Sequence, residues 1–156
     1  MNQELLTENQ VLAAELVGAA RDVLNVMFFT DIVEERFAST GAAALPLQVR
    51  VTFSGDECGE FRMAVDEEAA ESMAGSFLGS DPSTALSGTE VEEVMGELGN
   101  MICGAFLSRY ERDGLFALSS PVLTRPAEND LPGIHRSLEL MEGNMDLRVF
   151  WGKVPD

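Results

Sequence analysis

The longest periodic segment of the chain is Thr89–Tyr110, which reads TEVEEVMGELGNMICGAFLSRY. Its apolar residues recur at steps of three and four, the period of an α-helix. At about 100° of rotation per residue, one group of apolar residues falls within about 100° of arc. This group is Val91, Met95, Leu98, Ile102, Ala105 and Phe106. The segment therefore predicts a long amphipathic helix with a single stripe that faces a core.

The other side of this predicted helix carries an unusual set of residues. Glu93, Glu97, Asn100 and Gly104 lie within roughly 60° of one another, and we call them the polar ridge. Asn and Gly each cost up to about 1 kcal/mol of helix stability relative to Ala, so their presence needs an explanation. Gly104 leaves a groove beside Asn100 where another backbone could come close. The ridge is typical of a docking surface, although Glu and Asn on a helix surface often serve only solubility.

Two helices and a hairpin are predicted on the N-terminal side of this segment. Apolar residues between about 8 and 29 recur at helical spacing, which predicts a long first helix. Leu47–Phe53 alternates apolar and polar side chains, and Gly59–Val65 has the pattern of the antiparallel return strand of a hairpin. Asp66 is suited to cap a second helix that ends near Gly79, since acidic residues follow it in the first turn.

Strand-like runs return after the long helix. They are predicted at 116–118, 122–124, 136–141 and 145–151, with a turn at 142–144 and loops at 39–46 and 126–133. Strands that are grouped along the chain favour an antiparallel sheet over a parallel one. We therefore predict one α+β domain over residues 1–156, with an antiparallel sheet and long helices packed on one of its faces.

Composition excludes several classes of partner. The 156 residues include 10 basic and 27 acidic side chains, which gives a net charge of −17, and 46% of the residues are hydrophobic. The basic residues are scattered singly, so neither nucleic acid nor an anionic membrane is an expected partner. Cys58 and Cys103 are too few for a disulfide scaffold and have no metal-ligand spacing. Because the sequence shows no signal peptide or membrane-spanning run, we expect a cytoplasmic protein with reduced thiols.

The string ELGNMICG at residues 97–104 closely resembles the signature helix of the CheC/CheX/FliY family of chemotaxis phosphatases. The motif of that family is Glu-x-x-Asn followed by a half-helix rich in small residues. Similar features elsewhere are the hairpin at 51–59, the acid-capped helix after Asp66, and Ser120-Pro121-Val122. The resemblance covers about residues 10–153, although only the string at 97–104 is specific. Ala105 departs from the asparagine that often follows the family's second glycine.

The resemblance implies a phosphatase that acts on the phosphoaspartate of a CheY-type response regulator. By this likeness, Asn100 would orient a water in line with the acyl phosphate, and Glu97 would pair with the regulator's active-site lysine. Glu93 and Gly104 would help to dock the partner. The chain itself would bind no cofactor, since the phosphorylated regulator supplies Mg²⁺. An amide suits the first role because it donates and accepts hydrogen bonds without adding negative charge near a phosphoryl group.

A second site is conceivable on the first helix, since some members of the family repeat the motif there. Gly18, Asp22, Asn25 and Phe29 have the same spacing as the four residues of the polar ridge. Asp22 is one methylene shorter than Glu, however, and Phe29 fills the groove that Gly104 leaves open. The sequence therefore favours a single-site, CheX-like protein, and the resemblance to CheX implies a homodimer.

Two alternatives to a phosphatase stay open. A catalytically silent adapter could keep the fold and use the same ridge only to bind a signalling partner, because binding and hydrolysis share Glu97. A flagellar switch component would be favoured by an additional motor-binding domain, and these 156 residues have no segment of that kind.

Overall fold

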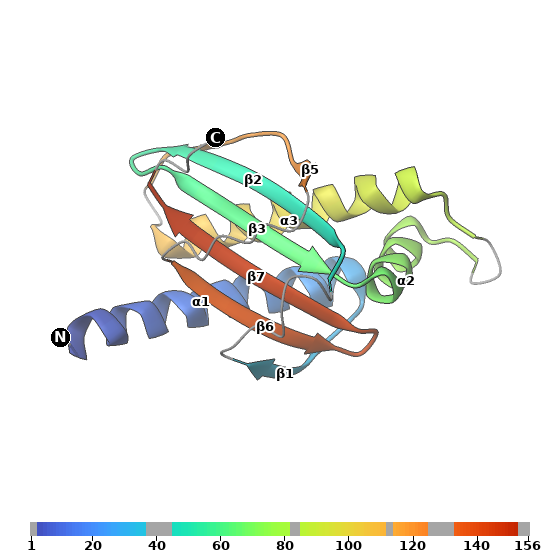
Figure 1. Ribbon diagram of the computed structural model, residues 1–156, viewed down its shortest axis with the longest axis horizontal. Helices are drawn as coiled ribbons and strands as arrows, with labels where there is room; N and C mark the ends of the chain where they lie inside the picture. Colours follow the sequence, from blue (N-terminus) through green and yellow to red (C-terminus); the bar gives the residue numbers. More distant parts are fainter. Residues whose placement is uncertain (1–2, 37–44, 82–84, 112–113, 125–132, 153–156) are drawn as a thin grey trace.

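The computed structural model describes residues 3–36, 45–81, 85–111, 114–124 and 133–152 (Figure 1). The predicted loops at 39–46 and 126–133 lie almost entirely outside the described residues. The elements in chain order are α1 (Gln3–Phe28), β1 (Ile32–Arg36), β2 (Leu47–Gly55), β3 (Gly59–Val65), α2 (Glu67–Leu78), α3 (Gly88–Tyr110), β4 (Phe116–Leu118), β5 (Val122–Thr124), β6 (Ile134–Leu140) and β7 (Asn144–Trp151).

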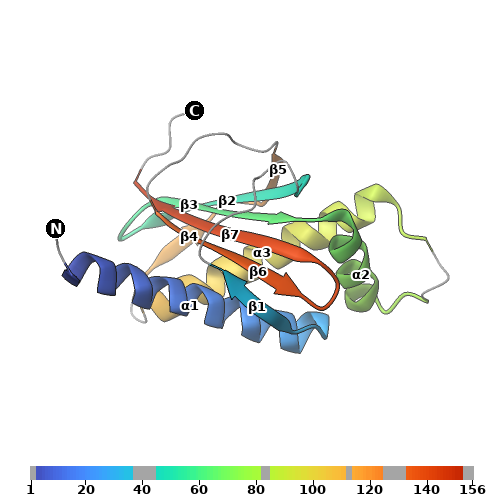
Figure 2. The same ribbon diagram turned by 60° about the horizontal axis from the view of Figure 1, so that its bottom comes forward.

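All strands join one antiparallel sheet in the order β1-β6-β7-β3-β2-β4, and β5 also pairs with β2. The long helices α1 and α3 lie side by side on one face of this sheet, and α2 lies at its end (Figures 1 and 2). The predicted α+β class, with an antiparallel sheet and long helices on one face, is confirmed.

The hydrophobic core lies between the sheet and the pair α1 and α3. Alternate residues of β2, β3 and β7 turn toward the helices, so that Val51 lies opposite Phe61 and Val149 lies opposite Phe61 on its other side. Each of these three side chains is fully buried. The period of two that the sequence shows in Leu47–Phe53 follows from this arrangement, because one face of the sheet meets the core.

The strand β1 is an element that the sequence analysis did not predict. Its five residues, IVEER, end in three charged side chains and lie at the edge of the sheet, where charge is common because it discourages further strand pairing. The chain reaches β1 through Phe29, whose φ of 56° is left-handed and unusual for a residue other than glycine. Thr30 N donates to Leu24 O at 3.2 Å and closes the end of α1.

Capping residues fix where α2 and α3 begin. Asp66 is the N-cap of α2, as predicted, and its carboxylate also accepts a hydrogen bond of 2.8 Å from the backbone N of Asn144, the first residue of β7. Ser87 and Glu90 form a reciprocal capping box at the start of α3. These caps satisfy backbone N–H groups in the first turn of each helix and fix where the helix begins.

Candidate functional site

The polar ridge lies on the side of α3 that faces away from the core. The carboxylates of Glu93 and Glu97 are exposed, whereas Asn100 and Gly104 are half-buried. Neither Glu93 nor Glu97 forms a hydrogen bond or an ion pair with any residue that the structure describes. The helix therefore presents two free carboxylates followed by an amide and a bare backbone along one line.

Two glycines of α3, Gly96 and Gly99, let the helix pack closely against its neighbours. A Cβ added at Gly99 would lie 2.9 Å from Cγ1 of Val49, so this glycine allows the helix to rest on the sheet. A Cβ at Gly96 would lie 3.3 Å from Cγ of Pro121. At Gly104, by contrast, the nearest atom is Cδ1 of Leu118 at 3.7 Å, an ordinary contact. Packing within the chain thus explains Gly99 and Gly96 but does not require a glycine at 104.

This difference predicts opposite effects for one substitution at two positions. Gly99→Ala should lower the free energy of unfolding by about 1–2 kcal/mol, because the clash with Val49 outweighs the better helix propensity. Gly104→Ala should raise it by up to about 1 kcal/mol, since the new methyl group has room. Urea titration of the two variants against wild type measures both. Equal shifts in the same direction would contradict the packing described here.

Asn100 lies between Gly96 and Gly104 on α3, and its Oδ1 atom is buried. No residue in the described ranges donates a hydrogen bond to this oxygen. A buried acceptor without a donor costs about 1–3 kcal/mol, so such atoms are rare in positions that serve only stability. The side chain can therefore turn toward another molecule without breaking a hydrogen bond from a described residue to this oxygen.

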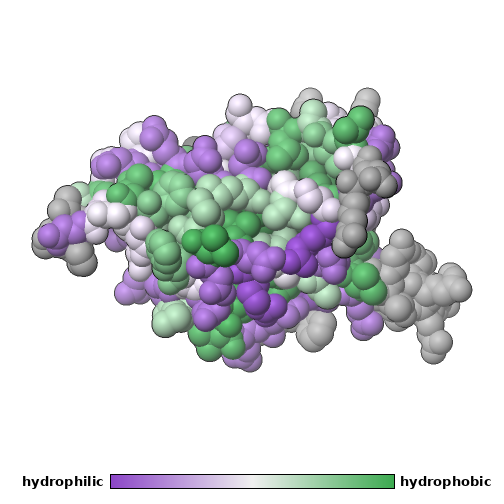
Figure 3. All heavy atoms as spheres, turned by 180° about the vertical axis from the view of Figure 1, so that it is seen from behind, coloured by the Kyte–Doolittle hydropathy of each residue, from purple (hydrophilic) through white to green (hydrophobic). Residues whose placement is uncertain are grey.

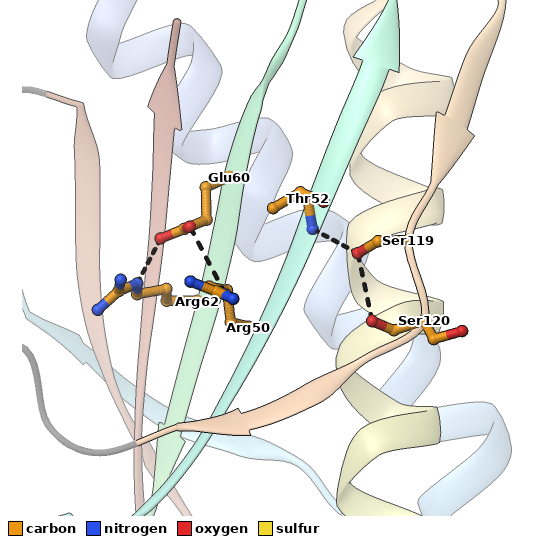
Figure 4. Close-up of polar contacts among 6 residues, drawn as sticks. All are labelled: Arg50, Thr52, Glu60, Arg62, Ser119 and Ser120. Atoms are coloured by element: carbon orange, nitrogen blue, oxygen red, sulfur yellow. Dashed lines mark hydrogen bonds and ion pairs between the residues drawn. The ribbon is translucent and has the colours of Figure 1, made fainter. Parts of the chain in front are cut away.

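The segment between β4 and β5 runs beside the polar ridge. Ser119 Oγ accepts a hydrogen bond of 2.9 Å from Thr52 N and donates one of 3.2 Å to Ser120 O (Figure 4). These bonds hold the segment to β2, with Leu118 and Pro121 against Gly104 and Gly96 of α3. Ser119 was not singled out from the sequence, because a serine in a short loop carries no distinguishing pattern.

A groove of about 610 Å³ adjoins the ridge. Its lining comes from the end of α2 (Phe77, Leu78), from α3 (Thr89, Glu92, Glu93, Val94, Gly96, Glu97) and from β2 and β5 with the residue before β5 (Val49, Pro121, Val122, Leu123). Two of the four ridge residues therefore form part of its wall. The sequence does not predict this groove, since its lining comes from four elements, α2, α3, β2 and β5, that only the tertiary fold brings together.

The structure engages Asp22 and Asn25 of α1 in contacts within the chain. Asp22 forms an ion pair with Arg109 of α3, and Asn25 Nδ2 donates to Asp31 Oδ1 at 2.7 Å. Arg109 packs where Gly18 has no side chain, since a Cβ there would lie 2.7 Å from its Nη1 atom. Asp22 thus supports the packing of α1 on α3, and Asn25 links α1 to the segment before β1. Glu97 differs from both, because its carboxylate is unpaired among the described residues.

Outside the ridge, we considered a reactive cysteine, a metal site and a membrane-spanning helix. Burial raises the pKa of the Cys103 thiol to about 12, so this residue is neutral at physiological pH and a poor nucleophile. Within the described ranges, no group of three His, Cys, Asp or Glu side chains is placed to hold a metal ion. No helix there is long and apolar enough to cross a membrane.

An antiparallel sheet with two long helices on one face, one of which carries a Glu-x-x-Asn ridge, places the chain in a class of two-layer α+β proteins. The family model described as "Chemotaxis phosphatase CheX" matches residues 47–134, and the chain belongs to this family. The match includes β2, β3, α2 and the whole of α3. A search of curated proteins found no relative of the chain.

Solved structures share the fold at low sequence identity. The chemotaxis protein CheX from Desulfovibrio desulfuricans has a TM-score of 0.71 and 16% identity, over 90% of this chain and 99% of that one. CheX from Vibrio vulnificus has a TM-score of 0.71 and 18% identity, over 90% and 96% of the two chains. A CheX–CheY–BeF3–Mg²⁺ complex from Borrelia burgdorferi has a TM-score of 0.65 and 16% identity, over 90% and 97%. At these identities the likeness establishes the fold.

Proposed function

We propose that this chain docks a phosphorylated CheY-type response regulator on the polar ridge and hydrolyses its phosphoaspartate. The proposal rests on two residues that lie three positions apart on α3. Glu97 is exposed and has no partner among the described residues, and the buried amide oxygen of Asn100 accepts no hydrogen bond from them. Membership of the CheX family and the complex of the Borrelia CheX with CheY support the choice of partner.

In this reaction the chain only has to position the attacking water and the regulator. Water attacks the phosphorus of the acyl phosphate, the bond to the aspartate oxygen breaks, and the regulator regains its carboxylate as inorganic phosphate leaves. The Asn100 amide can accept a hydrogen bond from the attacking water and so hold it in line. The regulator's own Mg²⁺ would neutralise charge on the phosphoryl group. Glu97 fixes the register by pairing with the regulator's lysine.

The deciding experiment is a phosphate-release assay with a phosphorylated CheY-type regulator from the same genome. We expect this chain to accelerate release well above the regulator's own rate of dephosphorylation. If the chain binds the phosphorylated regulator tightly without any acceleration, it is an adapter and the proposed phosphatase activity is wrong.

Removal of the Glu97 charge should weaken binding of the regulator more than it slows hydrolysis. Glu97→Gln is expected to raise KM about 10-fold with a smaller change in kcat, because an ion pair with a lysine is lost while the amide of Asn100 stays in place. Glu71→Gln, which removes the same charge from the exposed side of α2, is the matched control and should behave as wild type. Equal KM values for the two variants would argue against the docking role.

We also propose that the chain forms a homodimer. Large apolar side chains are exposed near the end of α1, on the edge strand β1 and after β6: Val26, Phe29, Val33 and Met141. Such a surface at a sheet edge favours self-association. Light scattering at micromolar concentration should give twice the mass of the chain, and Val33→Lys should shift the mass toward the monomer. A monomeric wild type would contradict this part.

A further inference from the structure

The groove beside the polar ridge has two kinds of wall. Its apolar walls are Leu78 at the end of α2 and, on the opposite side, Val122 and Leu123 of β5, which are exposed by 46%, 46% and 41%. Its acidic wall is α3, with Glu92 and Glu93. Large exposed apolar side chains gathered around one groove are typical of a protein-binding surface rather than of plain solvated surface.

The walls of the groove are held in place before any partner arrives. The ring of Phe77 stacks on Phe28 of α1, with ring centroids 4.8 Å apart, and this contact anchors the end of α2 to the core. On the opposite side, Pro121 packs against the bare backbone of Gly96. A groove with fixed walls loses little conformational freedom when it binds, which favours affinity.

The charge of the α3 wall restricts what can enter. Glu92, Glu93 and Glu97 are all exposed, and none of them forms an ion pair or a hydrogen bond with the residues that the structure describes. Among the described residues that line the groove, none is basic. An occupant without positive charge would bury these carboxylates unpaired, which is costly. An occupant with lysine or arginine beside its apolar side chains would instead satisfy both walls.

Seen from the side of α1 and α3, the surface has a band of hydrophobic residues between hydrophilic patches (Figure 3). Because Glu93 and Glu97 belong both to the ridge and to the groove, a partner seated on the ridge also contacts one wall of the groove. The occupant is therefore expected to be part of the same molecule that brings its phosphoryl group to Asn100.

We propose that the groove between α2, α3 and β5 is a specificity pocket for a basic, amphipathic segment of the response regulator. Its apolar side chains would lie between Leu78 and Leu123, and its basic side chains would meet Glu92 and Glu93. This inference rests on the proposed function, because it assigns the regulator as the occupant. The pocket selects among regulators by the sequence of that segment and takes no part in the hydrolysis itself.

The experiment measures steady-state kinetics and direct binding of the phosphorylated regulator for variants of each wall. We expect Leu78→Ser and Leu123→Ser to raise KM about 5-fold each, with kcat unchanged. Leu115→Ser, which alters a leucine that is 80% exposed outside the groove, is the matched control and should leave KM at the wild-type value. Circular dichroism and urea titration check that each variant is folded.

The acidic wall gives a second readout that does not depend on the packing of β5. Glu92→Lys should weaken binding more than Glu92→Gln, and both should reduce the dependence of Kd on salt concentration. The same two changes at Glu71 on α2 should have no effect. Normal hydrolysis with wild-type KM in all the groove variants would overturn this inference and leave the proposed function standing. A wild-type chain that neither binds nor dephosphorylates the regulator would overturn both.

Discussion

Asn100→Ala is expected to lower kcat for phosphoaspartate hydrolysis by at least about 100-fold, because the water loses the group that holds it in line. This factor corresponds to about 2.7 kcal/mol of activation free energy. The same substitution should leave the protein as stable as wild type or more stable. Alanine is the better helix former, and the buried Oδ1 atom loses no hydrogen bond from the described residues when it is removed.

This combination of a large loss of activity with a gain of stability separates a functional residue from a structural one. A phosphate-release assay at saturating regulator gives kcat, and urea titration gives the free energy of unfolding. Asn100→Asp is a close steric match that adds negative charge near the phosphoryl group, so it should be equally inactive. Ser108→Ala, on the exposed side of α3, is the control and should keep wild-type activity. Full activity in Asn100→Ala would end the assignment.

Much of the fold follows from patterns within single segments. The hairpin strand Gly59–Val65 and the short strands Phe116–Leu118 and Val122–Thr124 have the predicted bounds, because alternation and turn residues mark both of their ends. The edge strand β1 was missed for a physical reason. Three of its five residues are charged, and an edge strand is held by pairing with one neighbour rather than by burial of a face.

The candidate site also has one part that the sequence predicts, the polar ridge, and one part that it does not, the groove. Helical periodicity alone places Glu93, Glu97, Asn100 and Gly104 on one side of α3, since all four belong to a single regular element. The groove is different, because its walls come from α2, α3 and β5, and only the tertiary packing brings them together. Residues such as Leu123 have no local signal, since an apolar residue in a strand is expected to be buried.

The face of the sheet opposite the helices carries a buried charge that the sequence analysis did not anticipate. Glu60 of β3 is only 1% exposed, and it forms ion pairs with Arg62 on its own strand and with Arg50 on β2 (Figure 4). The Arg50 contact spans 3.8 Å between Nε and Oε1. Arg50 and Arg62 lie directly opposite each other in the register of β2 and β3. Two like charges at such positions repel, so the carboxylate between them stabilises the hairpin.

Glu60→Gln should therefore lower the free energy of unfolding by about 3 kcal/mol, at the lower end of the range for breaking a buried ion pair. The loss leaves the Arg62 guanidinium, whose side chain is 15% exposed, without its carboxylate and opposite another arginine. Arg50→Gln should cost less than about 1 kcal/mol, because the Arg50 side chain is 40% exposed and solvent screens its charge. Urea titration of both variants measures this difference.

A double-mutant cycle tests whether the ion pair itself is responsible. Glu60→Gln with Arg62→Gln removes both charges, so the double variant should be more stable than the sum of the two single losses predicts, by about 1–3 kcal/mol. Any loss of unfolding free energy that remains in the double variant relative to wild type measures the hydrogen bonds that the two glutamines do not restore. Because Glu60 lies on the face of the sheet away from α3, kcat of the folded double variant should equal that of wild type. Additive losses would mean that Glu60 stabilises the hairpin by packing and not through its charge.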